Sequence, residues 1–417
     1  MTPGTIWLLV SAALVLFMTP GLAFFYGGLV KAKSVVSMMM LSFGAIGLVG
    51  VLWVLYGANM ATLDNSGSDW IKQVLGNPFS DFGQWDAAKD SFGGGDGGVL
   101  ASVAFGSTFA IITVALISGA IADRARFFPW MLFAGLFATL VYFPVAGWVF
   151  AFNDDGMTGW IGNLGDNLGI DASTIDFAGG TAVHINAGAA ALALALVLGQ
   201  RVGFSKELQK PHNVPLVLIG AAILWFGWFG FNTGAAAGDG MATLIFVNTI
   251  VCPAAGILGW IIVEHFKNGK ATSVGAASGA VAGLVAITPS CVALQPIWAI
   301  VLGLLAGGVC AIAVDLKFKL GYDDSLDVVG IHLVAGIIGT LYLGFFAMET
   351  GLFTGGGNLD QLILQAVSAI AVAVYSFVVS YAIATVINRT IGFRIHQDEE
   401  SAGIDSVLHG EEGYALV

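Results

Sequence analysis

Charged residues are scarce in this sequence. Only 10% of its 417 residues are charged, whereas a soluble globular domain carries about a quarter. This scarcity excludes an ordinary soluble domain. The 57% hydrophobic content and the mean hydropathy of +0.87 indicate instead that lipid surrounds most of the chain. The net charge of −12 comes from loops and a terminal tail, so it indicates no charged partner, and we expect no nucleic-acid partner.

Cysteine is also rare and shows no metal-binding pattern. Cys252, Cys291 and Cys310 lie in apolar segments without C-x-x-C or C-x-x-H spacing, so we interpret them as small buried hydrophobic residues. The N-terminal segment lacks the basic region of a cleaved signal peptide. We therefore expect the first apolar run to remain as a span. We predict no cofactor, no metal and no enzymatic activity.

Eleven apolar runs are each close to the roughly 20 residues that cross a bilayer. They cover residues 5–29, 36–61, 98–122, 127–152, 177–199, 214–232, 240–264, 273–289, 296–316, 330–348 and 361–387. Proline interrupts several of them, as at Pro20, Pro144 and Pro253, which favours a bundle that lines a cavity. We predict an all-α integral membrane domain of eleven transmembrane helices over residues 1–390 and a C-terminal tail over residues 391–417.

The basic residues fall almost entirely on one side of these spans. Of the 15 Lys and Arg residues, thirteen share that side: Lys31, Lys33, Arg124, Arg126, Arg201, Lys206, Lys210, Lys267, Lys270, Lys317, Lys319, Arg389 and Arg394. Only Lys72 and Lys89 lie on the other side. Because cytoplasmic loops are enriched in basic residues, we predict a protein of the cytoplasmic membrane with its N-terminus outside and its C-terminal tail in the cytoplasm.

A short motif recurs in the fifth and tenth spans. Both contain H-x-x-A-G, beginning at His184 and at His332, and an aspartate precedes each motif, Asp176 and Asp327. These positions are the last helices of two predicted five-helix halves. The pattern predicts a pseudo-two-fold inverted repeat, with the eleventh span as an extra helix.

His184 and His332 differ from the other histidines because each lies inside an apolar span. Ionisable groups at that depth usually mark an ion or proton path. The alternative is a histidine satisfied by a backbone carbonyl, and the matching positions favour function. Two imidazoles can share a proton and present a donor and an acceptor to a small polar guest, whereas a metal site needs further ligands. We expect the remaining histidines to be solvated: His212, His265, His396 and His409.

Two further features lie near the predicted outer ends of spans. Asp176 opens the fifth span and either ligates a cation or caps the helix start, and we prefer the cap. Residues 225–231 contain five aromatic rings at the end of the sixth span. They form either a packed aromatic cluster or a cation–π cradle with a hydrophobic gate.

These segments resemble motifs of the ammonium transporter (Amt/Mep/Rh) family, of the bacterial type. The matching stretches occur in the family's order at residues 24–29, 123–127, 176–186, 228–232 and 327–332. The resemblance covers essentially the whole chain. It implies an eleven-helix bundle that assembles as a homotrimer with one pore per subunit, and it implies transport of ammonium or ammonia across the cell membrane.

The resemblance also implies roles for individual residues. His184 and His332 match the twin pore histidines, which would act as a proton relay. Phe109 and Phe231 match two stacked phenylalanines that close the outer pore. The other matching positions contribute to ammonium recruitment and pore lining: Trp228, Asp176 and Thr288.

The sequence departs from the family pattern at the outer recruitment site. That site typically uses a Trp and a Ser, where this chain has Phe150 and Ala235. Trp148 lies two residues before Phe150 and could substitute only if the helix end shifts. We therefore expect weak recruitment of ammonium. One alternative is an ammonium sensor of the same fold with weak or absent transport, and another is an unrelated secondary transporter or a carbon dioxide channel like the Rh branch.

The implied mechanism relies on the ability of ammonium to lose a proton. A charge in a dry apolar pore costs several kcal/mol, so neutral ammonia passes where potassium is excluded. Residues 398–414 resemble the cytoplasmic tail of the family, which implies that they pack under the bundle and that a PII-type signalling protein binds there. Composition alone favours a disordered acidic tail.

Overall fold

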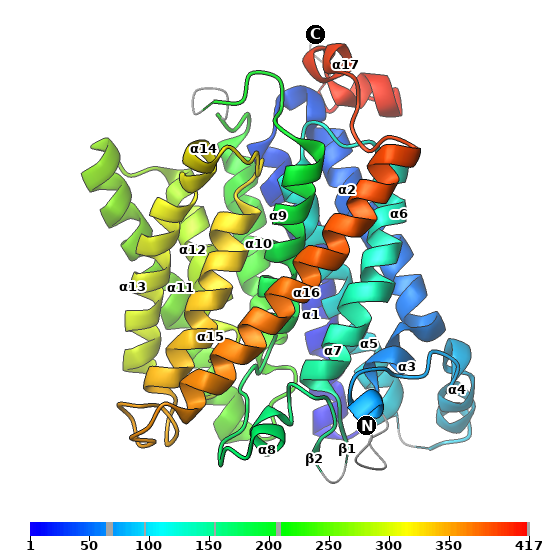
Figure 1. Cartoon of the computed structure of the whole chain (residues 1–417), viewed down its shortest axis with the longest axis vertical. Helices are drawn as coiled ribbons and strands as arrows, with labels where there is room; N and C mark the ends of the chain where they lie inside the picture. Colours follow the sequence, from blue (N-terminus) through cyan, green and yellow to red (C-terminus); the bar gives the residue numbers. More distant parts are fainter. Residues whose placement is uncertain (64–69, 96, 154–155, 206–209, 415–417) are drawn as a thin grey trace.

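Apolar helices stand side by side in one bundle, as Figure 1 shows. The computed structural model describes the chain except for residues 64–69, 96, 154–155, 206–209 and 415–417. Lys206, one of the thirteen basic residues above, therefore lies outside the described residues. In lipid, a chain satisfies its backbone N–H and C=O groups by forming helices or a closed barrel, which is why these long apolar runs are helical.

Ten helical stretches in the described part of the chain are long and apolar enough to cross a membrane. The protein is therefore a multi-pass membrane protein. In chain order these stretches contain α1 (Pro3–Leu29), α2 (Val35–Leu52) with η2 (Trp53–Gly57) and α3 (Ala58–Ala61), α5 (Gly98–Ile117) with η5 (Ser118–Ile121), α6 (Phe127–Phe137) with η6 (Ala138–Tyr142) and α7 (Phe143–Phe150), η7 (Gly180–Ile185) with α9 (Asn186–Leu198), α10 (Val214–Thr233), α11 (Asp239–Asn268), α13 (Pro296–Ala313) with α14 (Leu316–Leu320), η9 (Val329–Leu333) with α15 (Val334–Phe346), and α16 (Asp360–Thr390). The predicted span over 273–289 is the shorter apolar helix α12 (Ser273–Ile287), which has 15 residues.

The remaining elements occupy loops and the tail. They are η3 (Trp70–Gln73), η4 (Phe82–Gln84), α4 (Trp85–Phe92), α8 (Leu164–Leu168), α17 (Gln397–Ala402), η10 (Asp405–His409), and the strands β1 (Phe152–Asn153) and β2 (Gly156–Met157), whereas η1 (Ala32–Ser34) opens the second stretch. The two strands pair antiparallel, with Phe152 opposite Met157.

The helices differ in how deeply they are enclosed. The stretch formed by η7 and α9 is the most enclosed of the ten, with 83% of it buried inside the molecule, and only 33% of α16 is buried. Helix α16 crosses the outside of the bundle obliquely (Figure 1) and exposes an apolar stripe that includes Ile370, Val374 and Val378. Such a stripe suits contact with lipid, and the enclosed η7–α9 helix is suited to line an internal path.

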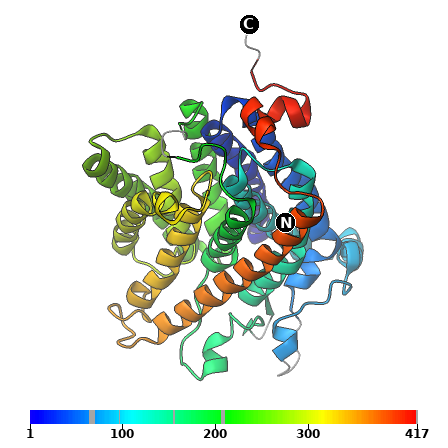
Figure 2. The ribbon, with the colours of Figure 1, turned by 45° about the horizontal axis from the view of Figure 1, so that its top comes forward.

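The two chain termini lie at opposite ends of the bundle (Figure 1). Residues 391–414 run across one end, which we call the tail face. There the Arg126 N–H donates to the Phe393 carbonyl at 3.0 Å, and the Asp405 carboxylate accepts from the N–H groups of Val36 and Ser37 at 3.0 and 2.7 Å. Figure 2 shows the tail beside the N-terminal helices. The tail is thus docked on the bundle, and the disorder that composition alone favours is not what the structure shows.

His212 corrects one expectation. Its Nδ1 lies 2.8 Å from the Val30 carbonyl oxygen, and its Nε2 lies 2.8 Å from the hydroxyl of Tyr414 in the tail. The prediction that His212 is a solvated surface residue is therefore wrong. The sequence gives no sign of this contact because its partners are 182 and 202 residues away.

Candidate pore

The structure brings His184 and His332 together at the centre of the bundle. Their Nδ1 atoms lie 3.2 Å apart, and their rings stack at 5.3 Å with an angle of 19°. Both residues are buried, with 1% and 4% of their surface exposed. At this separation one Nδ1 donates a proton and the other accepts it. A neutral pair therefore shares one hydrogen bond.

Each histidine lies in a π-helical segment, η7 for His184 and η9 for His332. Such segments widen an α-helix by one residue per turn and are frequent at functional sites. The sequence predicts helices at both positions but not these π-helical segments, because no residue type specifies a π-turn.

The glycine of each H-x-x-A-G motif allows the two histidine helices to cross closely. A Cβ atom on Gly188 would lie 2.6 Å from the backbone nitrogen of Leu333, the residue after His332. A Cβ on Gly336 would lie 3.3 Å from the Cβ of His184. Each glycine therefore makes room for the other helix beside its histidine, and the motif has a packing role.

Asp176 caps the π-helical segment that carries His184. Its carboxylate accepts from the N–H groups of Gly179 and Gly180 at 2.9 and 2.5 Å. It also accepts from the N–H groups of Thr181 and Ala182 at 2.8 and 3.2 Å and from the Thr181 hydroxyl. Both oxygens are thus occupied by groups that begin a helix, as in a helix cap. This geometry supports the preferred interpretation over direct ligation of a cation.

The matching cap of the second histidine helix is Asp324, and not Asp327. The Asp324 carboxylate accepts from the N–H groups of Val328 and Val329 at 3.1 and 2.7 Å. Asp327 instead forms an ion pair with Lys317 at 2.7 Å. The sequence pairs Asp327 with Asp176 as the aspartate before each motif, whereas the structure gives the matching capping position to Asp324. The spacing of eight residues between Asp176 and His184 could have identified Asp324.

A narrow cavity of about 10 Å³, close to the volume of one water-sized sphere, runs beside the histidines. Its walls are formed by Met18, Leu22, Phe25, Ile112, Leu116, Val183, His184, Leu224, Trp228, Phe231, Val281 and His332. Apart from the two imidazoles, these side chains present mostly apolar atoms. Within the described residues, the buried Nε2 of His184 has no hydrogen-bond partner. This nitrogen can bind a small polar guest.

Phe109 and Phe231 stack on each other at the end of the cavity away from the tail face. Their ring centroids lie 4.1 Å apart at an angle of 15°, and Phe231 lies 6.1 Å from the His184 ring. Phe105 contacts the Phe109 edge at 4.8 Å. The stacked rings are 6% and 2% exposed, and Phe231 forms part of the cavity wall.

Trp228 lines the cavity beside His184, and Thr288, which is not among the cavity-lining residues, bonds to its indole. The Trp228 indole N–H donates to the Thr288 hydroxyl at 2.8 Å, and this hydroxyl donates to the Leu284 carbonyl at 2.7 Å. The indole also stacks on His184 at 5.5 Å with an angle of 16°. Elsewhere in residues 225–231, Phe226 is 58% exposed and Phe229 stacks on Phe246. Only Trp228 and Phe231 of this run therefore line the cavity.

The residues of the predicted recruitment site are only partly together. Phe150 contacts the edge of Phe109 at 6.4 Å, and Ala235 lies exposed in the turn after α10. Trp148 packs against Tyr375 at 4.7 Å and donates its indole N–H to the Val74 carbonyl at 2.8 Å. Trp148 therefore points away from Phe109 and does not replace the missing Trp. The only aromatic side chain of α7 beside the phenylalanine stack is Phe150.

Many enclosed helices around a narrow apolar cavity with two buried imidazoles define a membrane transport protein. The chain belongs to the Ammonium Transporter Family, whose model matches residues 6–414. It is 51% identical to an ammonium transporter of Mycobacterium tuberculosis, over 98% of this chain and 90% of the relative. It is 42% identical to an ammonium transporter of Bacillus subtilis, over 98% of each chain.

Solved structures agree with this assignment. The Mep2 structure from Candida albicans has a TM-score of 0.83 and 29% identity and covers 99% of this chain and 93% of its own. A structure described as a sensor Amt protein has a TM-score of 0.86 and 26% identity, with coverage of 97% and 98%. The described helices therefore adopt the fold of Amt and Mep proteins.

Proposed function

We propose that this protein carries ammonium nitrogen across the cytoplasmic membrane by removing a proton at the outer mouth and passing ammonia through the apolar cavity. The observation that carries the proposal is the contact of 3.2 Å between His184 and His332 in a cavity whose walls are otherwise mostly apolar. The family membership and the names of the relatives agree with it.

The cavity walls disfavour any ion. A charge inside the bilayer without compensating groups costs several kcal/mol, and no carboxylate is among the residues that line the cavity. Ammonium escapes this cost by giving up a proton, whereas potassium cannot. Selectivity then follows from chemistry, since the two ions are similar in size and charge.

The histidine pair provides the polar contacts that ammonia needs. The shared Nδ1 hydrogen bond fixes both rings, and the Nε2 of His184 remains available to a guest. Ammonia both donates and accepts hydrogen bonds, so it can bind at either tautomer of the pair. The same pair supplies a short relay for the released proton: uptake at the free Nε2 of His184 passes the shared Nδ1 proton to His332, which then releases its own Nε2 proton, so both rings end neutral.

The outer mouth recruits ammonium weakly. Phe109, Phe231 and Phe150 offer aromatic faces and edges to a cation, and Ala235 supplies no hydroxyl. Cation–π attraction contributes about 0.5–2 kcal/mol. A serine hydroxyl at this position would also accept a hydrogen bond from ammonium, and such a bond to a charged group contributes about 1.5–3 kcal/mol. Aromatic contact alone therefore gives low apparent affinity.

The tail face is the cytoplasmic face in this proposal. It carries Arg124, whose carbonyl accepts from the Ile395 N–H of the tail, and Arg201, whose neighbour Val202 donates to Glu400 of the tail, as expected for cytoplasmic loops. Tags placed after Gly4 and at the C-terminus of the chain are expected to be accessible from opposite sides of the membrane. Labelling of both tags from one side would contradict the eleven-span topology.

Assembly and regulation complete the proposal. Three copies form a homotrimer with one pore per subunit, and a PII-type signalling protein binds at the tail face. The family membership and the docked tail support both parts. Cross-linking and mass measurement of the purified protein test the trimer. Deletion of the residues after Arg394 is expected to change activity or binding of the PII-type protein.

Flux through purified protein in liposomes tests the function. An ammonium pulse is expected to alkalinise the lumen, or to produce a current on a supported membrane, whereas potassium produces neither. A luminal pH change without current indicates net movement of ammonia, and a current indicates that the proton follows. The absence of both, in protein that elutes as the intact oligomer, would contradict transport.

A sensor of the same fold is the second candidate. It is favoured by the loss of the recruiting Trp and Ser at Phe150 and Ala235 and by the similarity to the sensor Amt structure. A sensor would bind ammonium and change conformation without carrying it. Ammonium-dependent protection of the tail from protease, in protein that shows no flux, would favour this candidate.

A further inference from the structure

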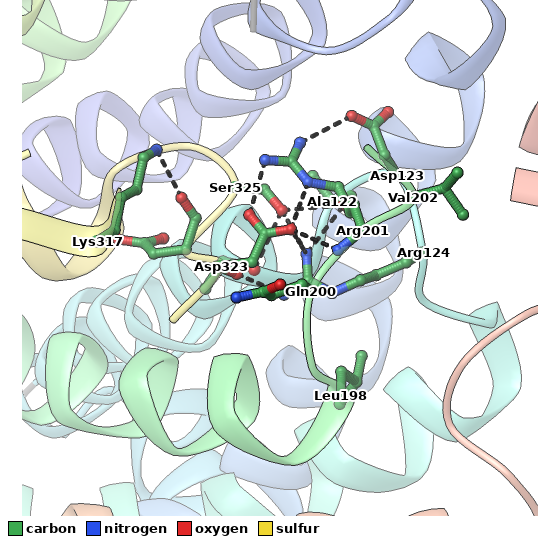
Figure 3. A network of polar contacts seen from close by, with 12 residues as sticks. Ala122, Asp123, Arg124, Leu198, Gln200, Arg201, Val202, Lys317, Asp323 and Ser325 are labelled. Carbon is green, nitrogen blue, oxygen red and sulfur yellow. Dashed lines mark hydrogen bonds and ion pairs between the residues drawn. The ribbon is translucent and has the colours of Figure 1, made fainter. Parts of the chain in front are cut away.

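We infer that Arg201 and Asp323 form a clamp that sets the position of the two pore histidines, and that both are positioning residues for transport. The inference rests on the proposed function of the histidine pair. Neither residue touches the cavity. They lie where the histidine helices reach the tail face, and Figure 3 shows them at the centre of a polar network.

The clamp joins the end of one histidine helix to the start of the other. Arg201 follows α9, which carries His184 at its beginning, and Asp323 precedes η9, which contains His332. The Arg201 Nε and Nη2 groups donate to the two Asp323 carboxylate oxygens, each at 2.8 Å. The backbone N–H of Arg201 donates to the same carboxylate at 2.7 Å. This two-pronged geometry fixes orientation as well as distance.

Buried partners hold the clamp on its other sides. Arg124 donates to the Asp323 carbonyl and to the Ser325 hydroxyl, each at 2.5 Å. Asp123 pairs with Arg201 at 3.2 Å. The Asp323 side chain is fully buried and that of Arg201 is 9% exposed. A buried pair of this kind has little freedom to rearrange, because loss of one partner leaves an uncompensated charge.

The charge of the clamp persists at neutral pH. Burial raises the pKa of Asp323, but the Arg201 hydrogen bonds and the charges of Arg124 and Arg201 outweigh it and hold the pKa below its ordinary value. Burial lowers the pKa of Arg124 to about 10, where the guanidinium is still protonated at neutral pH. The clamp is therefore a permanent ion pair and not a pH switch.

Rigid connections link the clamp to the histidines. On one side Asp323 adjoins Asp324, which caps η9 through Val328 and Val329, and His332 follows three residues later. On the other side α9 runs as a continuous helix from Leu198, three residues before Arg201, back to the histidine segment. The helices also touch at Gly188 and Leu333. A displacement at the clamp therefore changes how the two helices cross, and with it the 3.2 Å contact of the rings.

The docked tail holds the same segment. Arg394 donates to the carbonyl of Leu198, the last residue of α9, at 3.1 Å. Glu400 accepts from the Val202 N–H and from Arg394, both at 2.7 Å. Residues 198–202 are thus bonded to the tail on one side and to Asp323 on the other. A change in how the tail is docked would therefore act on the histidine pair through the clamp.

The competing interpretation is that this network only stabilises the fold. Both interpretations predict a less stable protein when the clamp is broken, so stability does not distinguish them. The two interpretations make different predictions for the fraction of the variant protein that folds and assembles correctly. A positioning role changes the histidine contact and the maximal flux, whereas a stabilising role leaves both unchanged in correctly assembled protein.

The test uses Arg201→Lys, which keeps the charge but loses the two-pronged geometry, and Asp323→Asn. The control is Asp315→Asn, which removes an ion pair with Lys267 that lies elsewhere and is partly exposed. Oligomers of equal size are selected and reconstituted. Because a displacement of about 1 Å at a reacting group can cost on the order of 10²-fold in rate, we expect Arg201→Lys to lower the maximal ammonium flux by at least ~10-fold. The half-saturating concentration, set at the distant outer mouth, stays unchanged.

Nitrogen NMR of labelled histidine provides a second readout that does not depend on flux. The signals of the pair are identified by their loss in the His184→Ala/His332→Ala variant, and we expect them to shift in both clamp variants and not in the control. Unchanged signals and flux in assembled Arg201→Lys would overturn the inference. So would failure of both clamp variants to assemble while the control assembles, because the clamp would then be structural. If the wild-type protein carries no ammonium, the proposed function fails and the NMR result still decides the clamp.

Discussion

Asp176 and Asp324 occupy matching positions in the two histidine helices. Each lies eight residues before its histidine, and each carboxylate accepts hydrogen bonds from N–H groups at the start of a π-helical segment. Asp176 accepts from the Gly180 N–H, and Asp324 accepts from the Val329 N–H. Asp176 lies toward the phenylalanine stack and Asp324 lies at the tail face. One carboxylate therefore anchors each histidine helix at opposite ends of the cavity, which is the relation expected of an inverted repeat.

Replacement of a pore histidine by aspartate is expected to relax selectivity. His184→Asp or His332→Asp places a carboxylate in the apolar cavity without its partner, and a cation that was excluded is then stabilised. We expect potassium current in these variants, measured on oligomers selected by size. His265→Asp, at an exposed position, is the control. Variants that assemble normally and still exclude potassium while carrying ammonium would contradict the proposed role of the pair.

Gly188→Ala is expected to separate the histidine helices. The new methyl group would lie 2.6 Å from the backbone of Leu333, and overpacking of this kind typically costs about 1–3 kcal/mol. We expect a lower melting temperature together with reduced ammonium flux. Gly47→Ala is the matched control, because a Cβ at Gly47 meets nothing within 4 Å. Equal flux and equal melting temperature in the two variants would show that the close approach is not required.

Ala235→Ser is expected to restore part of the missing recruitment site. A hydroxyl at this position adds an acceptor for ammonium, and a hydrogen bond to a charged group contributes about 1.5–3 kcal/mol. The half-saturating ammonium concentration should therefore fall by about tenfold or more, with maximal flux unchanged. Ala237→Ser, also exposed and two residues further along, should have no effect. An unchanged concentration in Ala235→Ser would show that the hydroxyl is irrelevant in this pore.

Asp324 is expected to make stability depend on pH. Burial raises the pKa of Asp324 from 3.8 to about 6, with Lys317 lowering it and Asp327 raising it further. Below pH 4 the carboxyl is protonated in both the folded and the unfolded state. As the pH rises from about 4 to about 6, only the unfolded state releases its proton freely. The free energy of unfolding should therefore fall by about 3 kcal/mol across this window, at 1.36 kcal/mol per pKa unit.

Asp324→Asn removes this pH-dependent contribution to the free energy of unfolding while keeping the size of the side chain. Thermal unfolding of the purified protein at several pH values measures the contribution as the difference in stability between wild type and variant. Asp360→Asn, which changes a partly exposed carboxylate at the first residue of α16, is the control. If the difference in stability between wild type and Asp324→Asn is the same at pH 4 and at pH 6, Asp324 titrates as an ordinary exposed carboxylate.

Part of the candidate site could be predicted from the sequence because its residues are of a type that is rare inside an apolar span. An imidazole inside an apolar span is costly, so His184 and His332 were recognisable without a structure, and their shared motif connected them. Phe109 came only from the family resemblance, since phenylalanine is ordinary in a membrane helix, whereas Phe231 also lies in the aromatic run 225–231. Trp148 could not be placed from sequence, because a rotation of the helix end decides whether it faces the cavity or Tyr375.

The sequence by itself determined the spans and their order. Bilayer thickness sets the length of a crossing helix, and the cost of unsatisfied backbone groups in lipid makes each long apolar run helical. The uneven distribution of Lys and Arg follows the same local reasoning and predicts the topology. Tertiary structure decided which groups meet: Asp324 and not Asp327 as the cap of the second histidine helix, His212 against Tyr414, and Arg201 against Asp323. These contacts join segments far apart in the chain, and they depend on helix rotation and crossing that no local pattern of residues specifies.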